Sequence, residues 1–169
     1  MVDPRTLFDL TGRVACITGA SSGLGRRAAT ALAAAGAQVI GVARSEEPLL
    51  VLKAEISENA AYVVADVADR DAIPELFSAV STPFGAPDIV IHAAGVNTRQ
   101  PADEVTPEGW DATLALNLSA PFFLSQAMVP AMKEKGWGRI VNFASLQTTR
   151  AFPGGIAYGA TKGGIGQLT

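Results

Sequence analysis

Residues 18–25 read Thr18-Gly19-Ala20-Ser21-Ser22-Gly23-Leu24-Gly25, between the apolar run 14–17 and an alanine-rich segment. The apolar run predicts a buried strand and the alanine-rich segment predicts a helix. A glycine-rich turn between strand and helix lets the backbone approach a pyrophosphate, while the helix N-terminus offers unpaired N–H groups. Glycines also form tight turns without a ligand, but this context favours dinucleotide binding. The predicted contacts are Gly19, Ser21, Ser22, Gly23, Leu24 and Gly25.

Outward from this turn, short β-rich runs alternate with Ala- and Leu-rich stretches along the whole chain. This alternation is typical of a parallel sheet covered by helices. The predicted strands are Arg13–Thr18, Gln38–Val42, Ala61–Val64, Asp88–His92 and Arg139–Ala144. The predicted helices are Gly23–Ala35, Glu47–Ile56, Asp69–Val80, Thr106–Glu134 and Ala157–Thr169. We therefore expect one layered α/β domain over residues 1–169.

The composition narrows the classes of function. With 49% hydrophobic and 17% charged residues, the 169-residue chain suits one soluble domain. A net charge of −3 gives no attraction to nucleic acid or to anionic membranes. No apolar run approaches the roughly 18 residues of a membrane span, and the N-terminus lacks a signal-peptide hydrophobic region. We expect a cytoplasmic protein with neither nucleic-acid nor membrane partners.

Metal and disulfide chemistry are not expected. Cys16 is the single cysteine, so it has no intramolecular disulfide partner, and it lies in an apolar run that predicts burial. His92 is the single histidine, and we interpret it as a structural residue rather than a metal ligand.

Polar residues that follow the second and third strands bear on the choice of cofactor. Where dinucleotide-binding folds often place an acid that contacts the ribose 2′-hydroxyl of NAD, this chain has Ala43 and then Arg44. A guanidinium pairs with a 2′-phosphate, so NADP(H) is favoured and NAD(H) is the alternative. Asp66, before Val67, either accepts a hydrogen bond from an adenine amino group or caps the helix that follows. Ala94 and Gly95 are small enough for the backbone to pass close to a cofactor.

The stretch from Tyr158 to Lys162 is the candidate site of proton transfer. In a helix these two residues share one face, and a nearby ammonium favours the charged form of a phenol. Ser145, thirteen residues before the tyrosine, could hold a substrate oxygen beside the phenol. Alternatively, a Tyr and a Lys four apart are an ordinary helix surface. Asn117, in a largely apolar segment, is either a satisfied core amide or part of a polar site with water.

Taken together, these segments resemble the short-chain dehydrogenase/reductase family from Gly12 to Thr169. The resemblance rests on the order and spacing of Thr18–Gly25, Asp66, Ala94-Gly95, Asn117, Ser145 after Val141-Asn142-Phe143-Ala144, and Tyr158-x-x-x-Lys162. It implies a doubly wound parallel sheet of the Rossmann type in the order 3-2-1-4-5-6-7, of which this chain supplies 3-2-1-4-5. One departure is His92-Ala93, where most of the family has Asn-Asn before Ala-Gly.

The resemblance also implies a role for each site residue. Tyr158 looks like the catalytic acid/base, and Ser145 like the residue that orients and polarises the substrate oxygen. Lys162 would hold the nicotinamide ribose and promote ionisation of the tyrosine, and Asn117 would hold a water that links the lysine to solvent. Further candidates for substrate contact are Gln147, Thr148, Arg150 and Phe152.

The implied activity is an NAD(P)-dependent alcohol dehydrogenase or carbonyl reductase, usually a dimer or tetramer. The segments 39–44 and 121–126 look like those of 3-oxoacyl-carrier-protein reductases and of sugar or sugar-acid dehydrogenases. A non-catalytic dinucleotide-binding or redox-sensing module is the alternative. Family members continue through two further strands and a substrate-covering loop. We therefore expect a chain truncated before these elements, which alone binds cofactor weakly or is inactive.

Overall fold

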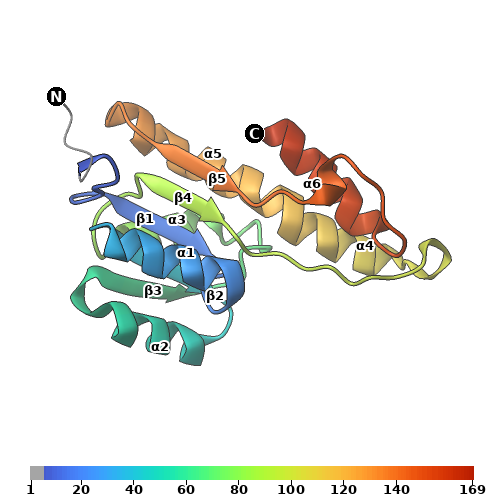
Figure 1. Cartoon of the computed structure of the whole chain (residues 1–169), viewed down its shortest axis with the longest axis horizontal. Helices are drawn as coiled ribbons and strands as arrows, with labels where there is room; N and C mark the ends of the chain where they lie inside the picture. Colours follow the sequence, from blue (N-terminus) through green and yellow to red (C-terminus); the bar gives the residue numbers. More distant parts are fainter. Residues whose placement is uncertain (1–5) are drawn as a thin grey trace.

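The computed structural model describes residues 6–169 and contains one five-stranded parallel sheet (Figure 1). The strand order β3-β2-β1-β4-β5 confirms the predicted doubly wound fold. The strands are β1 (Val14–Thr18), β2 (Gln38–Ala43), β3 (Ala60–Val64), β4 (Ile89–His92) and β5 (Arg139–Asn142). All five predicted strands are confirmed to within two residues at each end. Their carboxyl ends lie at one edge of the sheet, where ligands bind in open α/β folds.

The helices follow the predicted alternation. They are α1 (Gly23–Ala34), α2 (Glu46–Ile56), α3 (Ile73–Ser81), α4 (Pro107–Leu114), α5 (Ala120–Glu134) and α6 (Ile156–Leu168). Short 3-10 turns occupy Ser57–Asn59, Ala102–Glu104 and Leu146–Thr148. The predicted helix Thr106–Glu134 is continuous, but a π-helical turn at Ala115–Ser119 joins α4 to α5.

The predicted start of α3 at Asp69 is wrong, because α3 begins at Ile73. Pro74 lies in its first turn, where the missing N–H of a proline removes no helical hydrogen bond. Asp69 precedes the helix and its Oδ1 accepts the N–H of Ala72, the N-cap residue, at 3.4 Å. Asp69 therefore stabilises the turn that precedes α3 and is not part of the helix.

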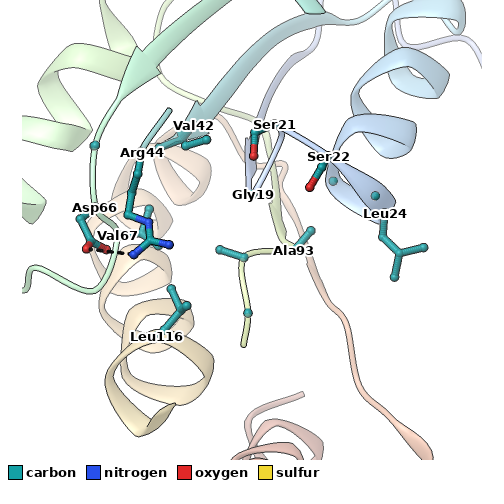
Figure 2. A pocket seen from close by; sticks show the side chains of 16 residues that line it. Gly19, Ser21, Ser22, Leu24, Val42, Arg44, Asp66, Val67, Ala93 and Leu116 are labelled. Carbon is teal, nitrogen blue, oxygen red and sulfur yellow. Dashed lines mark ion pairs between the residues drawn. The ribbon is translucent and has the colours of Figure 1, made fainter. Parts of the chain in front are cut away.

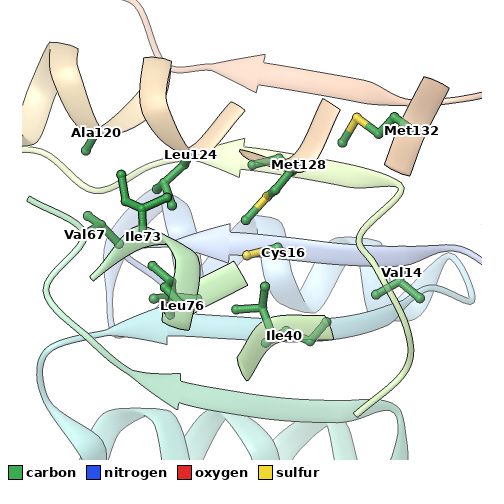
Figure 3. Packing of buried hydrophobic residues seen from close by; sticks show 13 residues of the cluster. Val14, Cys16, Ile40, Val67, Ile73, Leu76, Ala120, Leu124, Met128 and Met132 are labelled. Carbon is green, nitrogen blue, oxygen red and sulfur yellow. The ribbon is translucent and has the colours of Figure 1, made fainter. Parts of the chain in front are cut away.

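Apolar side chains from both faces of the sheet form the core. One cluster joins strand residues Cys16 and Ile40 to Leu76 of α3 and to Leu124 and Met128 of α5 (Figure 3). The cluster on the opposite face packs α1 and α2 against the sheet. Cys16 is fully buried, and burial raises the pKa of its thiol to about 12, so it is the predicted small core residue.

The helix Pro107–Glu134 is long and apolar enough to cross a membrane by length and composition alone, in the part of the chain that the structure describes. The expectation that no apolar segment reaches this length is therefore wrong. In the fold this helix packs against α3 and the sheet, and its residues Ala120, Leu124, Met128 and Met132 are buried in the core. Its apolar face is explained by this packing.

Candidate active site

The glycine-rich turn lies against the loop that follows β4. Gly19 has φ +68°, and a Cβ added there would lie 2.7 Å from the backbone nitrogen of Ala94. The Thr18 hydroxyl accepts the N–H of Ala94 at 3.2 Å and so joins the ends of β1 and β4. Glycine is therefore required here both by the backbone conformation and by the close approach of the two segments.

A cavity of about 380 Å³ opens in front of this turn, at the carboxyl ends of the strands. Figure 2 shows Ser21, Ser22 and Leu24 on one side of it, and Arg44, Asp66 and Val67 on the other. The structure brings together on this cavity the predicted residues Gly19, Ser21, Ser22, Gly23, Leu24, Gly25, Arg44, Asp66, Val67, Ala94 and Gly95. The sequence did not indicate Leu116, which reaches the cavity from the π-turn.

The cavity fits a phosphate-containing ligand at its glycine side. Ser22 is the N-cap residue of α1, yet within the described residues its side chain makes no capping hydrogen bond to that helix. The first turn of α1 carries no acidic side chain. Its N–H groups and the positive end of its dipole therefore face the glycine turn without a negative partner, as an anion site requires.

Arg44 and Asp66 form a weak ion pair across the other side of the cavity (Figure 2). The Arg44 Nη1 and Asp66 Oδ2 atoms are 4.0 Å apart, and the side chains are 75% and 48% exposed. An exposed pair at this distance contributes little to stability, so the guanidinium is available to a ligand. Asp66 Oδ1 accepts the N–H of Ala68 at 3.0 Å. Asp66 thus stabilises a turn and does not cap α3, which leaves the adenine interpretation open.

Lys162 and Tyr158 lie on one face of α6, as their spacing predicted. The Lys162 ammonium is 5.5 Å from the centroid of the Tyr158 ring, and its Nζ donates a 2.5 Å hydrogen bond to the carbonyl oxygen of Phe143. The lysine is 7% exposed, and burial lowers its pKa. The sequence did not indicate Phe143, whose carbonyl directly after β5 holds the ammonium near the Tyr158 ring.

Ser145 begins a short 3-10 turn that controls the direction of its hydroxyl. Its Oγ accepts the N–H of Gln147 at 3.2 Å, and its own N–H donates to the Thr148 hydroxyl at 3.2 Å. These reciprocal bonds form a capping box. Because the Oγ lone pair accepts the backbone N–H, its proton remains to be donated elsewhere.

Asn117 lies in the π-turn and is 1% exposed. Its Oδ1 accepts the N–H of Val96 and its Nδ2 donates to the carbonyl of Val96, both at 2.8 Å. The same Nδ2 donates to the Thr161 hydroxyl at 3.3 Å. A Cβ at Gly95, on the cavity wall, would lie 3.3 Å from Asn117 Oδ1. The amide therefore connects the cavity to the residue next to Lys162, and the predicted water-holding role stays a prediction.

His92 is buried against α5, as expected of a structural residue. The Ser125 hydroxyl donates to the carbonyl of Pro121 at 2.6 Å, so it accepts from His92 Nε2 at 2.9 Å. This fixes the neutral tautomer with the proton on Nε2. Burial lowers the pKa of His92 to about 4.

The other candidate substrate contacts line a second cavity of about 550 Å³, between the loop 147–156 and α6. Gln147, Thr148, Arg150 and Phe152 all face it, whereas Ser145 and Tyr158 do not line it. Within the described residues, the buried Gln147 Oε1 has no hydrogen-bond partner. A side chain with a free acceptor could contact the part of a substrate remote from the reacting carbon.

Comparison with known proteins agrees with this geometry. A family model described as short chain dehydrogenase matches residues 13–169. The D-threitol dehydrogenase of Mycolicibacterium smegmatis is 40% identical over 161 residues, which cover 94% of this chain and 62% of that protein. The gluconate 5-dehydrogenase of Gluconobacter oxydans is 38% identical over 96% of this chain and 65% of its own length.

A solved structure has the same fold. The gluconate 5-dehydrogenase of Burkholderia cenocepacia, in complex with NADP and tartrate, superposes with a TM-score of 0.92 at 34% identity. The match covers 99% of this chain and 67% of that one. The chain thus spans less than two thirds of the length of both curated relatives.

Proposed function

Because the chain belongs to the short-chain dehydrogenase family, we propose that it is an NAD(P)-dependent oxidoreductase that interconverts a secondary alcohol and a carbonyl. The observation that carries the proposal is the buried Lys162 ammonium, held by the Phe143 carbonyl 5.5 Å from the Tyr158 ring. Asn117 links this pair to the glycine-lined cavity. Its amide nitrogen donates to Thr161, the neighbour of Lys162, and its amide oxygen lies close to Gly95 on the cavity wall. The chemistry of this site is proton transfer beside a dinucleotide.

Tyr158 is the proposed acid/base. In reduction its phenolic proton passes to the substrate oxygen, and in oxidation the phenolate takes the proton of the alcohol. A bound nicotinamide supplies the hydride to the carbonyl carbon or accepts it from the alcohol carbon. The Lys162 ammonium stabilises the phenolate, because an adjacent positive charge favours the ionised phenol. The same ammonium would hold the nicotinamide ribose, and Asn117 would hold a water that links it to solvent.

Ser145 is proposed to hold the substrate oxygen. Its hydroxyl oxygen accepts the Gln147 N–H, so its proton can be donated to the oxygen on which negative charge develops during reduction. Gln147 is proposed to contact the substrate farther from the reacting carbon.

NADP(H) is the proposed cofactor and NAD(H) the second candidate. The glycine turn would hold the pyrophosphate, Arg44 the 2′-phosphate and Asp66 the adenine, with Val67, Ala94 and Gly95 against the remaining surface. The presence of NADP in a structure 34% identical to this chain supports the choice.

The proposed substrates are small hydroxylated molecules such as polyols and sugar acids, with 3-oxoacyl thioesters as the alternative. The names of the threitol and gluconate dehydrogenases support the first class. We further propose that the protein acts in the cytoplasm as a homodimer or homotetramer. The single buried free thiol among the described residues suits a reducing compartment.

The test uses protein expressed from its complete reading frame, with carbonyls of these classes and nicotinamide cofactor carrying deuterium at the transferred position. The proposal predicts turnover of at least one substrate, with deuterium on the new carbinol carbon. Cofactor binding without turnover of any carbonyl or alcohol would favour the redox-sensing module instead.

A further inference from the structure

We propose that Thr148 is a positioning residue that fixes Ser145 relative to α6, the helix that carries Tyr158 and Lys162. The inference rests on the proposed function, since it concerns the geometry of that proton-transfer site. Ser145 lies on the 3-10 turn after β5, whereas the other two residues lie on α6. Their relative placement depends on contacts between the turn and the helix.

The Thr148 hydroxyl makes a hydrogen bond to each side of this junction. It accepts the N–H of Ser145 at 3.2 Å and donates its proton to the carbonyl of Lys162 at 3.1 Å. One hydroxyl thus joins the backbone of the candidate substrate-orienting residue to the backbone of the candidate lysine. An aliphatic side chain such as valine could make neither contact.

The methyl group of Thr148 fixes the same junction by packing. A Cβ added at Gly166 of α6 would lie 2.5 Å from Thr148 Cγ2. The turn therefore approaches the helix so closely that position 166 has no room for a side chain beside threonine. Thr148 thus sets the distance between the turn that carries Ser145 and the helix α6, through its hydrogen bonds and its methyl contact.

This placement affects the chemical step. Proton donation by Ser145 and proton exchange by Tyr158 act on the same substrate oxygen, so both groups must be held in one geometry. Misplacement of a catalytic group by about 1 Å can lower the rate on the order of 100-fold. Loss of the Thr148 contacts should therefore lower kcat far more than cofactor affinity, because Thr148 does not line the glycine-turn cavity and bonds the backbone of Lys162 rather than its ammonium.

The first test compares Thr148→Val with Thr148→Ser. Valine keeps the branched shape without the hydroxyl, and serine keeps the hydroxyl without the methyl group. We expect kcat to fall roughly 10- to 100-fold in T148V and to stay within about threefold of wild type in T148S, and we expect the cofactor Kd to change less than threefold in both. The matched control is Thr113→Val, which removes a buried hydroxyl that donates only to Gly109 within α4. A kcat in T148V within twofold of wild type, or an equal loss in T148S, overturns the inference.

The second test does not depend on T148V folding. Gly166→Ala places a methyl group against Thr148 Cγ2, and we expect it to lower kcat by displacing the turn. Adding Thr148→Ser removes Cγ2, so the double variant G166A/T148S should regain the kcat of T148S. A double variant as slow as G166A contradicts the inference.

Amide hydrogen exchange separates this inference from the proposed function. If the wild-type protein turns over no substrate, the proposed function fails, and exchange still tests the contact. We expect the Ser145 amide to exchange at least tenfold faster in T148V than in wild type or T148S. Equal exchange in all three proteins shows that the Thr148 hydroxyl does not hold Ser145.

Discussion

Among single residues, Arg44 has the most direct consequence for cofactor choice. Its guanidinium lines the cavity and has one weak ion-pair partner among the described residues, Asp66. Arg44→Gln removes the proposed partner of the 2′-phosphate, and a hydrogen bond to a charged group contributes about 1.5–3 kcal/mol. We expect the Kd of NADPH to rise by roughly 10- to 100-fold and that of NADH to change less than threefold.

Isothermal titration with both cofactors checks this prediction. Arg27→Gln is the matched control, because Arg27 is exposed on α1 but does not line the cavity. A wild-type protein that binds NADH more tightly than NADPH would contradict the role of Arg44.

His92 should make the stability depend on pH. Its pKa is lowered to about 4 in the fold, from an ordinary value near 6.5, so below pH 6.5 the unfolded chain takes up a proton that the native protein does not. The associated stability is present above pH 6.5 and is lost as pH falls towards 4. Between pH 7 and pH 5 the loss from this residue is about 2 kcal/mol.

Urea unfolding at the two pH values measures this effect. Wild type should lose about 2 kcal/mol more than His92→Asn between pH 7 and pH 5, because asparagine does not titrate. The same pH dependence in both proteins would show that His92 is not the residue responsible.

At the scale of elements, the glycine turn connects β1 to α1 and forms one wall of the cavity. Gly19→Ala forces a side chain into the left-handed region and against the backbone of Ala94. We expect a loss of about 1–3 kcal/mol of stability and at least tenfold weaker cofactor binding. Gly163→Ala in α6 is the control, since no atom lies within 4 Å of the added Cβ. Cofactor affinity unchanged in G19A would argue against the turn as the pyrophosphate site.

The sequence predicted these elements well where burial is continuous. The runs that form β1 and β4 are buried along their lengths, and apolar continuity is the pattern of a strand covered on both faces. The glycine turn was predictable from its position, because Gly19 lies where a strand must turn sharply into a helix.

The features that the sequence did not predict depend on contacts between distant segments. The π-turn allows Asn117 to bond Val96, a residue in another segment of the chain. The intrinsic helix propensities of the residues do not depend on that contact, so they could not predict the π-turn. The Phe143 carbonyl became a partner of Lys162 only through the packing of α6 against the segment that follows β5. Thr148 stays a candidate for substrate contact, and the sequence did not indicate that its hydroxyl lies between Ser145 and Lys162.

At the scale of the whole molecule, we propose one dinucleotide-binding domain over the chain. Both apolar clusters pack on the same sheet, which supports a single unit. Within the described residues β5 pairs only with β4, so its outer edge is unpaired. Its residues Ile140 and Val141 are 38% and 43% exposed.

An unpaired, apolar edge strand promotes pairing between molecules. We expect the purified 169-residue chain to self-associate with rising concentration, and Val141→Lys to reduce that association. Leu50→Lys on α2 makes the same change of charge at a residue 48% exposed and serves as the control. Light scattering over a concentration series measures the effect, and equal association of V141K and wild type would count against β5 as the contact.

The central claim is that the Tyr158 hydroxyl exchanges the proton with the substrate oxygen, while other groups supply most of the dinucleotide's binding energy. Tyr158→Phe keeps the ring beside the Lys162 ammonium and removes only the hydroxyl. The decisive measurement is kcat together with the NADPH Kd for Y158F, in protein from the complete reading frame. The account predicts a fall in kcat of about 10²- to 10⁴-fold with a Kd within twofold of wild type. A kcat close to that of wild type would contradict it.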